Sequence, residues 1–392
     1  MRTVCAKTLK TFAFAGCNFW FIHCALAAPL NASEGDLQER VASRDFPSVF
    51  QAWNPATPLG GKSEEEMTAL HDLYFTGPGQ LGLKWVGKHE GEGTEFTPDS
   101  LLTASRKIAE LRRLNPQLLI LVEVRYRDAP PDFFSADSPY WLRDQAGQPV
   151  IGWKEGGYFK IDIHNTATRD LEARRARALV KTGLIDGVML DWWSDDPDRL
   201  DLIRAIRNAV GNKLILVNGN DHTFPLTAPF ANGTYMECTQ NNTPEDWARI
   251  SSTLRWAEQH TRAPRINCLE TWFHQSRQDF DLMRATTTLA LTQSDGYCLF
   301  CDPDPLPTPD HLHDWYPFWN KGLGQPVSVG VEQPDKSWRR EFTNGTVVYN
   351  PMGNAPVTVR FEQPYLSRAT GKVAQEHQIP PSDGDILIRQ KS

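Results

Sequence analysis

The sequence lacks several signatures that mark common protein classes. It contains no G-x-S-x-G motif, which counts against an esterase of the α/β-hydrolase type. Its seven cysteines lack the paired spacing of a zinc site. Beyond the first 27 residues, no run is long and apolar enough to span a membrane.

The first 27 residues have the layout of a secretory signal. A basic start with Arg2, Lys7 and Lys10 precedes an apolar run over 11–27 that ends in Ala-Leu-Ala, a small-x-small cleavage pattern. A membrane anchor is the alternative, because the run is close to the lower length limit of a spanning helix. We expect a signal peptide over residues 1–27, secretion or export to the periplasm, and no stable membrane insertion after cleavage.

Acidic residues outnumber basic residues in the rest of the chain. Removing the three basic residues of the predicted signal from the 41 Lys and Arg leaves 38, against 48 Asp and Glu, a net charge of −10. This sign is unfavourable for binding nucleic acid or an anionic polymer, whereas a neutral or cationic substrate suits it better. Buried thiols are favoured for the four remaining cysteines, and a disulfide in an oxidising compartment stays open. These cysteines are Cys238, Cys268, Cys298 and Cys301.

Short apolar runs alternate with amphipathic stretches over residues 45–325. Eight strands with intervening helices predict a (β/α)8 TIM barrel, and a doubly wound open sheet is the competing architecture. The predicted strands are Ser48–Trp53, Asp72–Thr76, Leu118–Val124, Gly187–Asp191, Lys213–Asn218, Thr234–Glu237, Arg265–Glu270 and Gly296–Asp302. The predicted helices are Leu101–Leu114, Thr168–Thr182, Asp198–Val210, Pro244–His260 and Asp279–Leu291.

Two regions depart from this alternation of strands and helices. Residues 125–165 are too long for a plain connection, and such loops are usually functional, although a structural flap is the alternative. Residues 158–163 alternate like a strand, and we assign them to this excursion. Residues 326–392 contain β-prone runs around an Asn-Gly turn and predict a small C-terminal antiparallel β domain. The excursion carries the aromatic residues Tyr140, Trp141, Trp153 and Tyr158.

Polar side chains stand at the ends of five predicted strands. The carboxyl ends of barrel strands form the functional face of a TIM barrel, so these side chains are expected to converge there. Alternatively, a carboxylate at a strand end can cap a helix or pair with an arginine. The five residues are Asp191, Asn218, Glu237, Glu270 and Asp302, and two indoles follow Asp191 directly.

Carboxylates gathered among aromatic residues favour chemistry on sugars. Cleavage of a glycosidic bond needs one ionised carboxyl group and one protonated carboxyl group. Asp191 has a short side chain on a rigid strand, which suits a nucleophile. Glu237 reaches further, which suits a proton donor, and Glu270 is the second candidate for that role.

Indoles at the barrel rim can stack on sugar rings, or they can fill the top of the barrel. No metal and no cofactor is expected. The Asp195–Asp198 run lacks the spacing of a calcium loop, and His311-x-His313 has no obvious third ligand. The predicted substrate-binding residues are Trp53, Lys84, Glu123, Arg125, Trp192, Trp193, Asn218, Asn220, Trp272 and Asp302.

Two motifs carry a family resemblance. Asp186–Trp193 resembles the fourth-strand motif of bacterial glycoside hydrolases in the broad α-amylase/α-galactosidase-like TIM-barrel assemblage. The stretch 299–307, followed by 311–316, resembles the family called hypothetical glycosyl hydrolase fifteen. The resemblance runs from about Phe50 to the C-terminus. It implies a TIM-type barrel, a carbohydrate substrate, a C-terminal β domain, a nucleophile at Asp191 and an acid/base carboxylate on a later strand.

The sequence therefore predicts a secreted glycoside hydrolase that acts on a poly- or oligosaccharide; retention of configuration is favoured, and inversion stays open as the alternative. A non-catalytic carbohydrate-binding barrel, associated with a surface polysaccharide system, is the alternative. A metal-dependent deacetylase is a third possibility. The glycan, its linkage and the oligomeric state stay open.

Overall fold

The computed structural model describes residues 34–302 and 311–390. The predicted signal peptide lies outside the described residues, and so does part of the motif that spans 299–307. No helix among the residues described has both the length and the apolar character needed to cross a membrane. Cys238, Cys268, Cys298 and Cys301 are all buried free thiols.

Eight parallel strands form one sheet, in the order in which they occur along the chain. The sheet closes between its first and last strands, where Val49 pairs with Cys298 and the Cys298 backbone N–H donates to the Ser48 carbonyl at 2.9 Å. The predicted TIM barrel is therefore confirmed. Its strands are β1 (Phe50–Ala52), β2 (Leu73–Thr76), β3 (Leu119–Glu123), β6 (Gly187–Leu190), β7 (Leu214–Asn218), β8 (Gly233–Cys238), β9 (Cys268–Trp272) and β10 (Tyr297–Cys301).

Side chains fill the interior of the barrel. The rings of Phe75 on β2 and Tyr235 on β8 lie 4.9 Å apart, although these strands are not neighbours in the sheet. Phe50 on β1 packs against both rings. Because both faces of each strand are buried, the strands appear in the sequence as nearly continuous apolar runs. This property explains why all eight were predictable.

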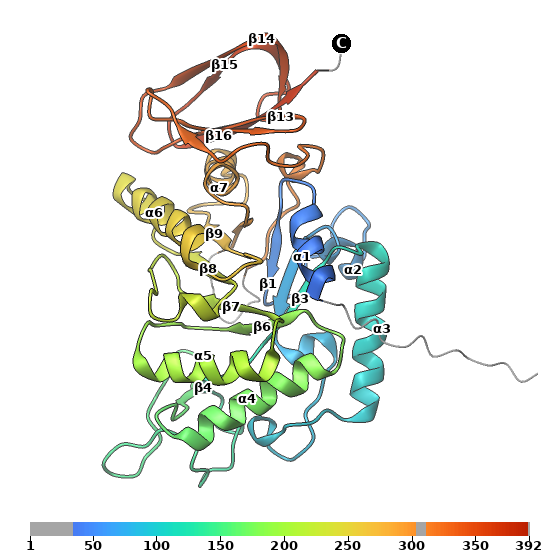
Figure 1. The fold of residues 1–392 in the computed structure, drawn as a ribbon, viewed down its shortest axis with the longest axis vertical. Helices are drawn as coiled ribbons and strands as arrows, with labels where there is room; N and C mark the ends of the chain where they lie inside the picture. The colour runs from blue at the N-terminus through green and yellow to red at the C-terminus, as the bar shows by residue number, and fades with distance from the viewer. Residues whose placement is uncertain (1–33, 303–310, 391–392) are drawn as a thin grey trace, which may run out of the picture. The chain divides into compact units, whose positions relative to one another are not determined.

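Helices cover the outside of the barrel (Figure 1). The sequence encodes their starts: Pro197 and Pro244 occupy first-turn positions, preceded by the capping side chains of Asp196 and Thr243. Only a short 3-10 turn, Ala228–Phe230, lies between β7 and β8. The helices are α1 (Glu34–Ser43), α2 (Glu64–Thr68), α3 (Pro98–Leu114), α4 (Thr166–Lys181), α5 (Pro197–Val210), α6 (Pro244–His260) and α7 (Phe280–Gln293).

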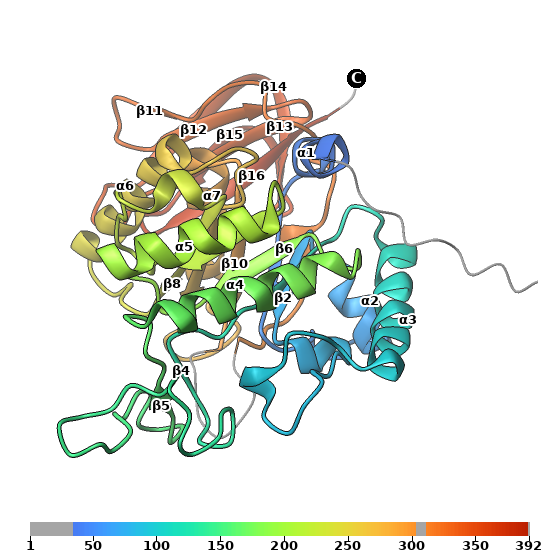
Figure 2. The ribbon, with the colours of Figure 1, turned by 60° about the horizontal axis from the view of Figure 1, so that its bottom comes forward.

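The long excursion between β3 and α4 extends from the barrel, as Figure 2 shows. It contains a two-stranded antiparallel sheet of β4 (Asp128–Ala129) and β5 (Phe159–Lys160). The alternating stretch 158–163 belongs to this excursion, as predicted. A small apolar cluster that includes Phe134 and Trp141 packs within the excursion. The excursion therefore has a hydrophobic core of its own.

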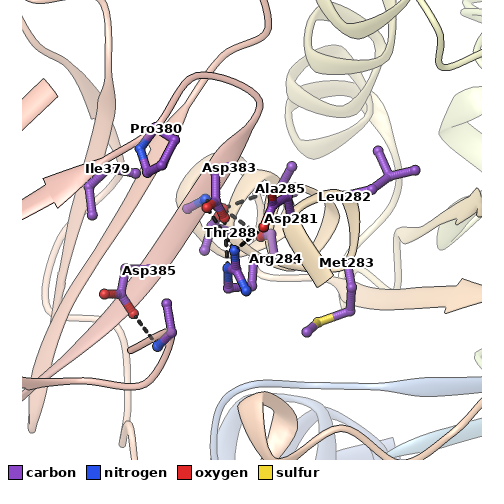
Figure 3. A network of polar contacts seen from close by, with 12 residues as sticks. Asp281, Leu282, Met283, Arg284, Ala285, Thr288, Ile379, Pro380, Asp383 and Asp385 are labelled. Carbon is purple, nitrogen blue, oxygen red and sulfur yellow. Dashed lines mark hydrogen bonds and ion pairs between the residues drawn. The ribbon is translucent and has the colours of Figure 1, made fainter. Parts of the chain in front are cut away.

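A six-stranded antiparallel sheet follows the barrel, and α7 packs between them (Figure 1). Residues 285–293 of α7 are all buried. At the edge of this contact, Arg284 donates to both carboxylate oxygens of Asp383 at 2.7 and 2.8 Å and also bonds Asp281 (Figure 3). The sheet contains β11 (Val331–Glu332), β12 (Trp338–Phe342), β13 (Gly345–Asn350), β14 (Val357–Ser367), β15 (Val373–Ile379) and β16 (Asp383–Arg389).

Candidate active site

A cavity of about 460 Å³ opens at the carboxyl ends of the barrel strands. Residues that follow β1, β2, β3, β6 and β10 build it, together with the last residue of β3, one residue of β8 and two aromatic residues of the excursion. Six predicted site residues lie in its wall. The lining residues are Trp53, Asn54, Gly77, Gln80, Glu123, Val124, Arg125, Tyr126, Arg127, Asp128, Trp153, Tyr158, Asp191, Trp192, Glu237 and His311.

Asn218 joins the two predicted catalytic carboxyl groups. Its Nδ2 donates to Asp191 Oδ1 at 2.8 Å and to Glu237 Oε2 at 2.9 Å. These two oxygens can therefore be no further apart than the sum of the two bond lengths, 5.7 Å. The Asn220 backbone N–H donates to Asn218 Oδ1 at 3.1 Å and so fixes the orientation of the amide. The geometry follows from strand order, because β7 lies between β6 and β8.

The two carboxyl groups differ in acidity. The pKa of Asp191 is raised to about 6. Burial is the largest cause and the Glu123 carboxylate adds to it, whereas Asn218 and Arg125 oppose the shift. Burial raises the pKa of Glu237 to about 8; His311 opposes this shift, and the neighbouring acidic groups Glu270 and Asp191 reinforce it. At neutral pH, Asp191 is mainly ionised and Glu237 is mainly protonated.

An ion pair flanks Asp191 at the end of β3. The Arg125 guanidinium donates to Glu123 Oε2 at 3.0 Å and lies over the Tyr158 ring, 5.2 Å from its centroid. The carboxylates of Glu123 and Asp191 raise the pKa of Arg125 although burial opposes the shift, so its positive charge is secure. Arg125 therefore places a fixed cation beside the ionised Asp191.

Three non-glycine residues of the wall have positive φ. Trp53, Trp192 and His311 have φ values of 55°, 53° and 56°, and the two tryptophans stand just beyond the ends of β1 and β6. A left-handed residue with a Cβ is strained, and such strain clusters at functional sites. Trp192 is 49% exposed, its carbonyl accepts a hydrogen bond from the Tyr126 hydroxyl at 2.9 Å, and the Arg127 guanidinium lies 4.2 Å from its ring. The indole is therefore held in place while part of its surface stays open.

Glu270 lies behind Glu237 and is fully buried. Trp272 Nε1 donates to its Oε1 at 2.7 Å, and the Tyr235 hydroxyl donates to its Oε2 at 3.0 Å. His311 Nδ1 lies 2.9 Å from the same Oε1. Glu270 therefore contacts the site through His311 and does not line the cavity.

Three other predicted substrate-binding residues lie away from the cavity as the described residues define it. Trp193 is buried in the apolar core, where its Nε1 donates to Thr227 Oγ1 at 2.9 Å. The side chain of Lys84 is exposed on a loop. Both carboxylate oxygens of Asp302 are bonded by Arg277, at 2.9 and 2.6 Å.

Trp272 and Asn220 support the site without lining it. Trp272 bonds Glu270, and Asn220 orients Asn218 through its backbone. The cavity also includes residues that sequence reasoning did not select. Arg127 and Asp128 lie near the start of the excursion. Because long loops are usually functional, the length of the excursion could have indicated these residues. His311 was considered only as a metal ligand, and no pattern indicated its contact with Glu270.

One group among the described residues has donor atoms close enough for a metal ion. The candidate ligand atoms of Glu270, Cys301 and His311 all lie within 4.8 Å of one another. The Glu270 carboxylate, however, already accepts hydrogen bonds from Trp272 and Tyr235 and contacts His311. We interpret the group as a hydrogen-bonded cluster.

No protein-family model matches the sequence, and a search of curated proteins finds no match. Solved structures do match. A maltogenic α-amylase from Thermotoga neapolitana has a TM-score of 0.56 and 12% identity, over 89% of this chain and 99% of that one. An α-amylase from Lactobacillus plantarum gives 0.56 and 9%, over 90% and 99%. An α-amylase from Malbranchea cinnamomea gives 0.53 and 11%, over 91% and 97%.

The chain has the fold of these α-amylases. At such low identity, the similarity concerns the fold alone, that is, the barrel and its C-terminal sheet. This fold agrees with the broad α-amylase/α-galactosidase-like assemblage that the fourth-strand motif indicates. Residue roles must therefore be argued from the site of this chain.

Proposed function

We propose that this protein is a glycoside hydrolase that cleaves O-glycosidic bonds in a poly- or oligosaccharide with retention of anomeric configuration. The observation that carries the proposal is the single Asn218 amide bonded to both Asp191 and Glu237. Retaining enzymes hold their two carboxyl groups about 5–5.5 Å apart, and inverting enzymes about 6.5–9.5 Å. The limit of 5.7 Å between the bonded oxygens supports retention.

The difference in acidity assigns the roles. Asp191, ionised at neutral pH, attacks the anomeric carbon and forms a glycosyl ester as the bond to the leaving oxygen breaks. Glu237 gives its proton to that oxygen in the same step. Glu237 then takes a proton from a water molecule, whose oxygen attacks the anomeric carbon of the ester; the bond from this carbon to Asp191 breaks, which releases the sugar and the Asp191 carboxylate.

Aromatic side chains around the carboxyl pair suit a sugar ring. The exposed face of Trp192, with Trp53 and Tyr158 elsewhere in the wall, offers flat apolar surfaces, while the carboxylates and Arg127 offer hydrogen bonds to hydroxyls. The similar solved structures are named α-amylases. Alpha-glucans therefore belong in the first substrate panel, beside neutral and cationic polysaccharides.

Secretion and the finer family are parts of the same proposal. The basic start and apolar run of residues 1–27 support export, and a polysaccharide substrate outside the cell is consistent with it. The motif at 299–307 supports membership of hypothetical glycosyl hydrolase fifteen. A purely binding barrel would need no paired carboxyl groups, so the bridged pair favours hydrolysis over binding alone.

The first test screens the purified protein against this panel for new reducing ends. Asp191→Asn should lose nearly all turnover and stay folded, because the substitution removes the charge and keeps the shape. Asp196→Asn is the matched control, since Asn caps the start of α5 as well as Asp does. Wild-type turnover in the Asp191 variant would refute the assignment. Proton NMR of the first product should show the substrate's own anomeric configuration.

A second test separates Glu237 from Glu270. Glu237→Ala should lose activity on natural glycans but keep much of it on dinitrophenyl glycosides, whose leaving group needs no proton. Azide added to this variant should give a glycosyl azide of retained configuration, because the alanine leaves space for the anion and no carboxylate repels it. The same pattern in Glu270→Ala, with a normal Glu237 variant, would reassign the role to Glu270.

A further inference from the structure

A buried chain of polar groups leads away from Glu237 to the interior of the barrel. His311 Nε2 lies 3.9 Å from Glu237 Oε1, and His311 Nδ1 lies 2.9 Å from Glu270 Oε1. The Tyr235 hydroxyl bonds the other oxygen of Glu270 and lies 3.3 Å from His311 Nδ1. His311 is 1% exposed, yet it contributes to the cavity wall.

These contacts fix the imidazole. A carboxylate that faces one ring nitrogen keeps the proton on that nitrogen, so Nδ1 of His311 donates to Glu270. The second nitrogen, Nε2, then points toward the acid/base. The φ of 56° at His311 is unusual, and it places the ring between the two carboxyl groups.

We propose that His311 is a positioning residue which, held by Glu270, stabilises the anionic form of Glu237 and so sets the upper pH limit of catalysis. This inference rests on the proposed function, because it takes Glu237 as the proton donor. His311 acts through Glu237 and needs no contact with the sugar.

The reaction creates a need for such a cation. When Glu237 gives its proton to the leaving oxygen, a new negative charge forms in a site that already contains other acidic groups. The positive charge of His311 beside Glu237 offsets this negative charge until Glu237 takes a proton from water, so the two residues end the reaction with as many protons as they had at its start. Among the residues that the structure describes, the titratable groups that face Glu237 or His311 are Asp191 after β6, Tyr235 on β8, Glu270 on β9 and Cys301 on β10.

The test replaces the ring while keeping its anchor. His311→Asn retains a side chain that tolerates positive φ and an amide that can donate to Glu270. Loss of the cation should raise the pH at which Glu237 loses its proton. The basic limb of the kcat/KM profile should therefore move up by about one pH unit, while the acid limb stays in place.

His313→Asn is the matched control. His313 is another buried imidazole, two residues away, whose Nε2 lies 2.9 Å from Gln51 Oε1 and 3.1 Å from His71 Nε2. Burial lowers the pKa of His313 to about 4, so the ring is neutral and its replacement removes no charge. This variant should leave the basic limb unchanged. A basic limb that stays in place or moves down in His311→Asn would overturn the proposal.

A measurement without substrate separates this proposal from the proposed function. Carboxyl carbon NMR, with the Glu237 signal assigned by its loss in Glu237→Gln, should show Glu237 titrating at higher pH in His311→Asn than in the wild type. Should His311→Asn fail to fold, the reciprocal experiment applies: the His311 ring should lose its proton at lower pH in Glu237→Gln. Unchanged titration in either variant refutes the coupling, whether or not a glycan is cleaved. Normal coupling without turnover on any glycan refutes only the hydrolase.

Discussion

Replacing Asn218 by alanine should move the whole pH profile of the enzyme to higher pH. The Asn218 amide lowers the pKa of both Asp191 and Glu237, because it donates one hydrogen bond to each carboxyl group. A hydrogen bond to a charged group contributes about 1.5–3 kcal/mol, and one pH unit corresponds to about 1.4 kcal/mol. Each group should therefore titrate about one pH unit higher in the variant.

The sign of each change follows from the role proposed for each group. In the proposed mechanism Asp191 must be ionised to attack, so a higher pKa moves the acid limb of kcat/KM upward. Glu237 must be protonated to assist the leaving group, so a higher pKa moves the basic limb upward as well. Because the two groups are coupled, the limbs report the pair. This behaviour differs from that of His311→Asn, in which only the basic limb should move.

The assay is kcat/KM on one soluble oligosaccharide across a series of buffers at constant ionic strength. Asn220→Gly is the control, because glycine keeps the positive φ and the backbone N–H that bonds Asn218. Its profile should match that of the wild type. A limb that stays in place, or moves to lower pH, in Asn218→Ala would show that the amide does not set the acidity of the pair.

Three further outcomes follow from the structure. Trp192→Ala should raise KM by up to about ten-fold with little change in kcat, measured by steady-state kinetics, because a stacking surface is lost; unchanged KM would remove Trp192 from the substrate site. Glu237→Gln should raise Tm over the wild type increasingly between about pH 4.3 and pH 8. The folded-state pKa is raised to about 8, so in this window the carboxyl ionises mainly in the unfolded chain, which favours unfolding of the wild type; a constant difference would contradict this. Gly330→Ala should destabilise the fold by about 1–3 kcal/mol in urea, because a Cβ there would meet the Thr292 carbonyl at 1.7 Å, whereas Gly79→Ala, with open space around it, should not.

The barrel was predictable because its strands are buried on both faces. The run ending at Asp191 is apolar to its last residue, and an abrupt carboxylate after such a run indicates a strand end. The pairing of Asp191 with Asn218 and Glu237 then follows from the order of three successive strands. Strand order is information that the sequence contains.

The orientation of side chains beyond the strand ends was not predictable. Trp192 and Trp193 are chemically identical neighbours, yet the first has a positive φ and lines the cavity, whereas the second is buried in the core. Glu237 and Glu270 are register partners on adjacent strands, yet Trp272 and Tyr235 bond only the second. Backbone strain and long-range hydrogen bonds of this kind have no local sequence pattern.

Helix α7 has a consequence for how this protein can be divided. From residue 285 to residue 293 the helix has no solvent-facing side, because barrel strands cover one flank and the C-terminal sheet covers the other. Such a helix belongs to neither neighbour alone. A truncation that ends the chain after the barrel would leave an uncovered apolar flank and should yield aggregated protein. The C-terminal sheet is therefore not a module that can be exchanged between enzymes, and the two parts should unfold in a single cooperative transition.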